Sequence, residues 1–131
     1  MGLFDFFKAN KEFIPEDTFE KILSNQETIT PKVVEQLRNI GITEDKSLKL
    51  EFFFYTNTND KAKELALELE KLNYEVYYDT SAANKKVFVI TGWTTQMLMD
   101  NDIIVKWAEK MCEIGYTYDC EFDGWGTTED Q

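Results

Sequence analysis

The chain contains no histidine among its 131 residues. Histidine is the side chain whose ordinary pKa lies closest to neutral pH, so acid–base catalysis would need a carboxylate, lysine or cysteine with a shifted pKa. The motifs GxSxG, HExxH and CxxC and a Walker-type phosphate loop are also missing. We therefore expect no catalytic residue, no cofactor and no metal ion, and a protein that is not an enzyme.

Cysteine and long apolar runs are scarce as well. Cys112 and Cys120 are the only cysteines, both within apolar patterns, and two cysteines make a poor zinc site, so buried reduced thiols are favoured. We find no signal-peptide pattern and no run of about 18 apolar residues. The phenylalanine-rich segment 1–13 could lie on a membrane, but it is short and packing on the fold is favoured. These features predict a cytoplasmic protein with no membrane partner.

Basic side chains are outnumbered, with 14 Lys and Arg against 25 Asp and Glu and a formal net charge of −11. Such a charge repels phosphate backbones, so direct binding of nucleic acid is disfavoured. A protein partner with a basic surface is favoured, because opposite charge accelerates encounter and rejects wrong partners.

The first third of the sequence predicts two short helices. Pro15 suits the first turn of a helix that stops near residues 24–25. Thr30 then reads as the N-cap of a second helix, with Pro31 in its first turn and Gly41 after its end. Residues 1–46 are therefore predicted to be a helical extension that packs on a main domain, residues 47–131.

The sequence of the main domain predicts strands and helices in alternation. Apolar and aromatic alternation indicates strands, and apolar spacing of three to four residues indicates helices, the second of which starts at Asp100 or Asn101 and ends at Gly115. The expected strands are 48–55, 74–79, 87–91 and 116–123, with helices between the first and second and between the third and fourth. This order predicts an α+β ferredoxin-like split βαββαβ sandwich, with both helices on one face of a four-stranded antiparallel sheet and the first and third strands central.

An aromatic surface is expected on the open face of this sheet. The more polar register of the first strand points Phe53 and Tyr55 outward, Tyr77 joins them, and the last strand adds Asp119, Glu121 and Asp123 along the rim. Exposed aromatic rings on such a sheet are typical of RNA binding, but the carboxylates argue against it. A protein partner, a homodimer, or residues 1–46 folded back as a lid remain open, and the lid is weighed as heavily as the other two together. Metal chelation by the three rim carboxylates is less favoured than a solvated edge.

The chain ends on a tryptophan between two glycines. Asp123–Gly124 is a turn signal and Gly126 gives a second permissive position, so Trp125 sits on a bent segment. It either closes the core, which is favoured, or anchors an interface. The candidate protein-binding residues are thus Phe53, Tyr55, Tyr77, Asp119, Glu121, Asp123 and Trp125.

Three segments carry a family resemblance: "LEFFFYT" at 50–56, "LNYEV" at 72–76 and "EFDGWGT" at 121–127. Together, over about residues 35–128, they resemble the ribonuclease E inhibitor, or regulator of ribonuclease activity B, family. The resemblance implies a ferredoxin-like, acidic, cytoplasmic bacterial protein that binds an endoribonuclease and restrains its activity on RNA. The best-known members continue into a long acidic tail, and residues 1–34 match no part of them. An immunity-type protein that neutralises a nuclease toxin, and a small metal-dependent enzyme, are the alternatives.

Overall fold

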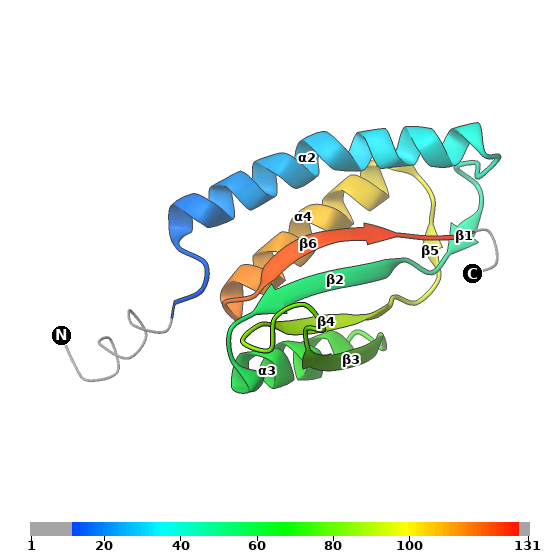
Figure 1. Ribbon diagram of the computed structural model, residues 1–131. Coiled ribbons are helices and arrows are strands. Elements are labelled where there is room, and N and C mark those ends of the chain that lie inside the picture. The colour runs from blue at the N-terminus through cyan, green and yellow to red at the C-terminus, as the bar shows by residue number, and fades with distance from the viewer. Residues whose placement is uncertain (1–11, 129–131) are drawn as a thin grey trace.

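A computed structural model describes residues 12–128 (Figure 1). Residues 1–11, which make up most of the phenylalanine-rich segment 1–13, lie outside the described residues. No helix in the described part has the length and apolarity needed to cross a bilayer. The elements, in order, are α2 (Glu16–Asn39), β1 (Ser47–Leu48), β2 (Glu51–Thr56), α3 (Asn59–Glu70), β3 (Glu75–Thr80), β4 (Phe88–Trp93), β5 (Met97–Leu98), α4 (Asn101–Thr117) and β6 (Glu121–Gly126).

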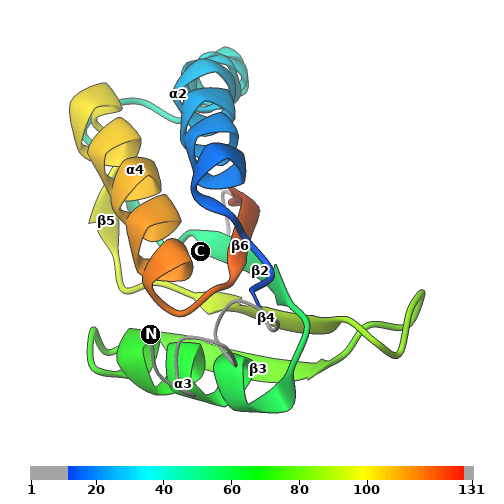
Figure 2. The ribbon, with the colours of Figure 1, turned by 90° about the vertical axis from the view of Figure 1, so that its left-hand side faces the viewer.

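The main sheet is antiparallel throughout, with the strand order β3-β4-β2-β6. This confirms the α+β class and the four-stranded antiparallel sheet, with β2 and β4 central. Helices α3 and α4 lie on one side of the sheet, and no helix within residues 12–128 covers its other side, which we call the open face (Figure 2). A separate pair of short strands, β1 and β5, joins the segments before β2 and after β4.

The alternation in β2 determines which face is buried. Phe52 and Phe54 are completely buried, while Phe53 and Tyr55, which alternate with them, are half-buried on the opposite face. Because successive side chains of a strand point to opposite faces, one register fills the core and the other faces outward. The expected outward register of β2 is confirmed.

Side-chain caps start two of the helices. The Thr58 hydroxyl accepts a hydrogen bond from the Lys61 backbone N–H at 3.3 Å, and the Asp100 carboxylate accepts one from the Ile103 N–H at 3.1 Å. Each cap satisfies a donor that the first turn of a helix leaves unpaired. The predicted start of the second domain helix at Asp100 or Asn101 is confirmed.

The prediction of two short N-terminal helices is wrong. One helix, α2, runs from Glu16 to Asn39 with Pro31 inside it, and Thr30 is a completely buried residue of its interior rather than an N-cap. A proline in a helix interior costs about 3 kcal/mol, but burial of an apolar stripe offsets this cost. The stripe includes Val34 and Leu37, which belong to the same core as the sheet. Tertiary packing has therefore overridden the local helix-stop signals.

Gly41 ends α2 as expected. It has a φ of +94°, its N–H bonds to the Arg38 carbonyl at 3.0 Å, and the Ile42 N–H bonds to the Leu37 carbonyl at 3.0 Å. This pair of bonds, with buried Leu37 and Ile42 at its ends, is a Schellman motif, which satisfies the last carbonyls of the helix.

The predicted end of α4 and start of the last strand are also wrong. The helix continues through Gly115 to Thr117, the chain turns at Asp119 with a φ of +58°, and β6 begins only at Glu121. Position 115 lies inside the helix and requires glycine, because a Cβ there would come within 2.6 Å of the Cys120 carbonyl oxygen. Glycine at this position reflects a close approach of the returning chain and not a helix end.

Helix α2 does not form the lid that was one of the alternatives for residues 1–46. It packs against α4 and β6 and lies beyond the β6 edge of the sheet (Figures 1 and 2). The stacking of Phe19 on Tyr116, with ring centroids 4.3 Å apart, fastens it to α4. Within residues 12–128, the lid interpretation is thus corrected: the helix extends the helical layer and borders the open face.

Candidate protein-binding surface

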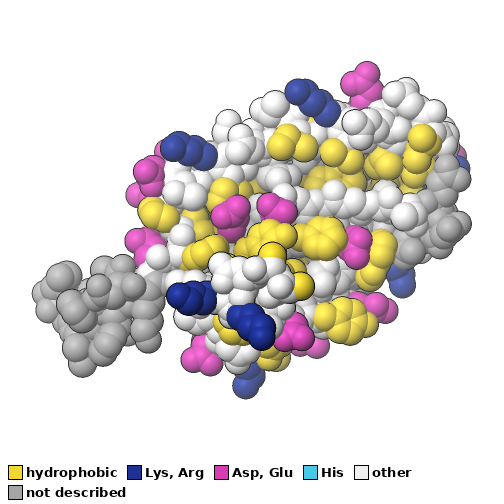
Figure 3. All heavy atoms as spheres, in the orientation of Figure 1, with side chains coloured by type: hydrophobic (Ala, Val, Ile, Leu, Met, Phe, Trp, Pro, Cys, Tyr) yellow, Lys and Arg dark blue, Asp and Glu magenta, His cyan; other side chains and the backbone are white. Residues whose placement is uncertain are grey.

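The open face of the sheet carries the predicted aromatic side chains. Phe53 lies opposite Thr91, Tyr55 lies opposite Val89, and Tyr77 pairs with Thr91 from the other side. Tyr77 is 63% exposed. Figure 3 shows hydrophobic side chains gathered over this face, with acidic side chains among them.

A bulge shapes the acidic rim. Phe53 pairs with Gly124 but Phe54 pairs with Phe122, so Asp123 is an extra residue in β6. Gly124 has a φ of +144°, which a residue with a side chain rarely adopts. The bulge bends the strand, leaves Asp123 exposed beside Phe53, and returns Trp125 to the opposite side of the sheet.

The rim carboxyl group of Glu121 has a raised pKa. Partial burial, and then the negative charge of Asp123, raise the pKa of Glu121 above its ordinary value. Both causes disfavour the ionised form of Glu121. A cation that approached this pair would relieve the repulsion, so the rim is suited to a positively charged group.

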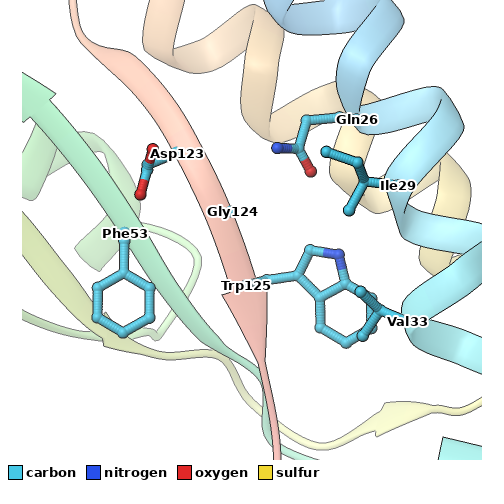
Figure 4. A pocket seen from close by; sticks show the side chains of 7 residues that line it. All are labelled: Gln26, Ile29, Val33, Phe53, Asp123, Gly124 and Trp125. Carbon is cyan, nitrogen blue, oxygen red and sulfur yellow. The ribbon is translucent and has the colours of Figure 1, made fainter. Parts of the chain in front are cut away.

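Trp125 points from β6 toward α2 (Figure 4). Its indole N–H donates a hydrogen bond to the Thr30 hydroxyl oxygen at 3.1 Å, and its ring meets Trp107 of α4 edge to face, with centroids 6.2 Å apart. It remains half-buried and packs against the core. The tryptophan therefore fastens α2 to the sheet and also contributes to the surface between them.

A hollow of about 270 Å³ lies between α2 and the sheet (Figure 4). Its walls combine apolar side chains with one carboxylate and one amide, and Ile29 on the α2 side is 47% exposed. We call it the α2–sheet groove; the residues that line it are Gln26, Ile29, Val33, Phe53, Asp123, Gly124 and Trp125.

Three of the seven predicted residues meet in this groove, namely Phe53, Asp123 and Trp125. Tyr55 and Glu121 form the next pair along β2 and β6. Tyr77 lies on the same face but on the edge strand β3, separated from β2 by β4.

Asp119 is in a different place from the one predicted. It lies in the turn before β6, and its two carboxylate oxygens accept the Phe13 and Ile14 N–H groups at 2.7 and 2.8 Å. The Lys61 ammonium pairs with the same carboxylate. Asp119 therefore fixes residues 13–14 to the fold and does not belong to the rim, which corrects its predicted place on the strand.

Sequence reasoning missed the contribution of α2 to the site. Gln26, Ile29 and Val33 form one wall of the groove. Their three- and four-residue spacing was a usable signal, but it crosses Pro31, where the sequence predicts a new helix. This wall would have been identified if the helical spacing had been followed across Pro31 as part of one continuous helix.

Two other kinds of site, a metal site and a reactive thiol, have little support in the described residues. No group of three or more Asp, Glu, Cys or His side chains within residues 12–128 is arranged to hold a metal ion. Cys112 and Cys120 are buried and unbonded to each other, and burial raises the pKa of each thiol to about 12. Such thiols are poor nucleophiles at neutral pH.

A family model described as Regulator of ribonuclease activity B matches residues 27–127. The chain belongs to this family. The match starts inside α2 and spans the whole sheet, so it contains every lining residue of the α2–sheet groove except Gln26. The family resemblance carried by the three segments is thereby confirmed, but its expected start near residue 35 is wrong, because the match also includes residues 27–34 of α2.

Curated relatives named Regulator of ribonuclease activity B occur in three bacteria. The protein of Shewanella amazonensis is 24% identical over 112 residues, which cover 84% of this chain and 79% of the relative. That of Pantoea ananatis is 26% identical over 117 residues, covering 83% and 79%. That of Psychromonas ingrahamii is 23% identical over 112 residues, covering 84% and 93%.

Proposed function

We propose that this protein is a non-enzymatic regulator of a ribonuclease, and that it acts by docking onto a basic surface of that enzyme. The names of its relatives, regulators of ribonuclease activity, support the class of target. We further propose that the fold is ferredoxin-like, which the strand order β3-β4-β2-β6 and the alternation of strands and helices support.

The observation that carries the proposal is the pairing of an apolar groove with carboxylates on one face. By strand register, the strands present no lysine or arginine on this open face. Their acidic residues on it are Glu51, Glu75, Asp79, Glu121 and Asp123. A field of this sign opposes a nucleic-acid backbone and attracts a cationic segment of a protein.

The groove would give such a segment its affinity. An aliphatic or aromatic side chain of the partner would enter between Ile29 and Phe53, and a neighbouring lysine or arginine would reach Asp123 and Glu121. Apolar anchors at the centre of an interface supply most of the binding free energy, while rim charges mainly govern the association rate. RNA cleavage would fall because the ribonuclease surface is occupied.

Charge reversal on the rim tests this proposal. The double variant Glu121→Lys, Asp123→Lys should associate about tenfold more slowly at low salt with an endoribonuclease of the source organism that has a basic segment. Its association rate should also depend less on salt, because two attractive charges become repulsive. Biolayer interferometry at several ionic strengths gives both quantities, and an RNA cleavage assay shows the matching loss of inhibition.

The matched control is Glu64→Lys, Glu113→Lys. These exposed residues lie on α3 and α4, on the helical side of the sheet, and their reversal changes the net charge by the same amount. Equal losses in both double variants would mean that only net charge matters, and absence of binding by the parent protein at low salt would contradict the proposal itself.

A further inference from the structure

A second groove lies on the helical side of the molecule, away from the open sheet face. It has a volume of about 330 Å³ and runs along α4 beside the end of α3. We call it the α4 groove; the residues that line it are Leu72, Tyr74, Ile103, Lys106, Trp107, Lys110, Met111 and Ile114.

The floor of the α4 groove and part of its rim are apolar. Trp107 and Met111 are buried beneath it, whereas Ile103 is 43% and Leu72 is 36% exposed at its edges. The indole N–H of Trp107 donates to the Tyr74 hydroxyl at 3.2 Å, which fixes the floor. From Ile103 to Ile114 the helix rises by about 16 Å, or about three turns.

The charged side chains that line this groove are basic, although the chain as a whole carries a negative net charge. Its only charged lining residues are Lys106 and Lys110, in a protein with a net charge of −11. Neither ammonium group forms an ion pair within residues 12–128, although Glu109 is close enough to Lys106 to interact with it electrostatically. Residues four apart on a helix have Cβ atoms about 6 Å apart on the same face. The two lysines can thus meet two carboxylates spaced one helical turn apart.

We propose that the α4 groove docks an acidic amphipathic helix of a second protein partner. The apolar stripe of that helix would cover Ile103, Leu72 and Trp107, and its flanking carboxylates would pair with Lys106 and Lys110. Three turns of exposed apolar surface suit a helix laid along α4. The paired lysines favour a polyanionic segment over a ligand with a single carboxylate. This surface is independent of the proposed ribonuclease-binding face, so both partners can bind at once.

Two designed peptides of 15 residues test the proposal on the full-length, ¹⁵N-labelled chain. Both carry the same leucine stripe at helical spacing; one flanks it with glutamates and the other with lysines. We expect the acidic peptide to shift the amide resonances of residues 72–74 and 103–114 with saturation, and to bind there about tenfold more tightly than the basic peptide, because two ion pairs replace two repulsive contacts.

The double variant Lys106→Glu, Lys110→Glu should reverse this preference at the same resonances. Lys85→Glu, Lys86→Glu in the exposed loop between β3 and β4 is the matched control, with the same change in net charge and an unchanged preference. Equal affinity for both peptides, no saturable shift in the groove, or a reversal in the control as well would overturn the proposal. Concentration-dependent shifts without peptide, abolished by Ile103→Glu, would identify a second copy as the occupant instead and also overturn it.

Discussion

Replacing Gly115 by alanine sets two opposite effects against each other. Alanine is favoured over glycine in a helix interior by about 1 kcal/mol, so propensity alone predicts a more stable protein. The new Cβ, however, would lie 2.6 Å from the Cys120 carbonyl oxygen and 2.9 Å from the Phe54 ring. Neither neighbour yields easily, because one is backbone and the other is a completely buried ring.

The steric effect should win. Forcing an extra carbon into a packed core costs about 1 to 3 kcal/mol, and a contact to backbone belongs in the upper part of that range. After subtraction of the propensity gain, Gly115→Ala should lower the free energy of unfolding by about 1 to 2 kcal/mol. The Cys120 N–H, which bonds to the Gly115 carbonyl at 2.8 Å, should lose protection as the turn moves away.

Urea unfolding followed by far-UV circular dichroism measures this difference as a lower midpoint at an unchanged slope. Gly126→Ala is the control, because nothing lies within 4 Å of a Cβ there and its φ is not positive. Its free energy of unfolding should stay within about 0.5 kcal/mol of the parent. A Gly115→Ala protein that is more stable than the parent would refute the close approach of α4 and the returning chain.

Two further substitutions test α2 and the rim. Pro31→Ala should raise the free energy of unfolding by about 2 kcal/mol in urea titrations, since the helix regains up to about 3 kcal/mol and the unfolded chain regains about 1 kcal/mol of entropy; no gain would mean that α2 is broken at Pro31. Glu121→Gln should flatten the pH dependence of stability, because a raised folded-state pKa means that stability is lost as pH rises through it. The variant should exceed the parent in thermal midpoint at pH 7 and match it well below the ordinary glutamate pKa of about 4.3, and equal midpoints at both pH values would contradict the raised pKa.

Regular patterns made the sheet predictable. The alternation around Phe53 and Tyr55 gave the correct outward register of β2, and the cap at Asp100 gave the start of α4. Both signals are local, so no knowledge of the packing was needed to interpret them.

The errors arose where a distant contact outweighed a local signal. Pro31 and Thr30 predict a helix start, but Thr30 is completely buried and accepts the indole N–H of Trp125, 95 positions away. Gly115 predicts a helix end, but it is required by the close return of the chain at Cys120. No residue near either position in the sequence reveals these partners.

Only the sheet wall of the α2–sheet groove could be predicted from the sequence, because the other wall depends on contacts between distant residues. Phe53 and Asp123 could be assigned to the open face from strand alternation and the turn signal, whereas the opposing wall depends on where α2 packs. Trp125 joins the two halves, because it fastens α2 through Thr30 while lining the α2–sheet groove. Core closure and a place in the proposed interface are therefore not exclusive alternatives: the contact that packs Trp125 against the core also holds the second wall of the α2–sheet groove in position.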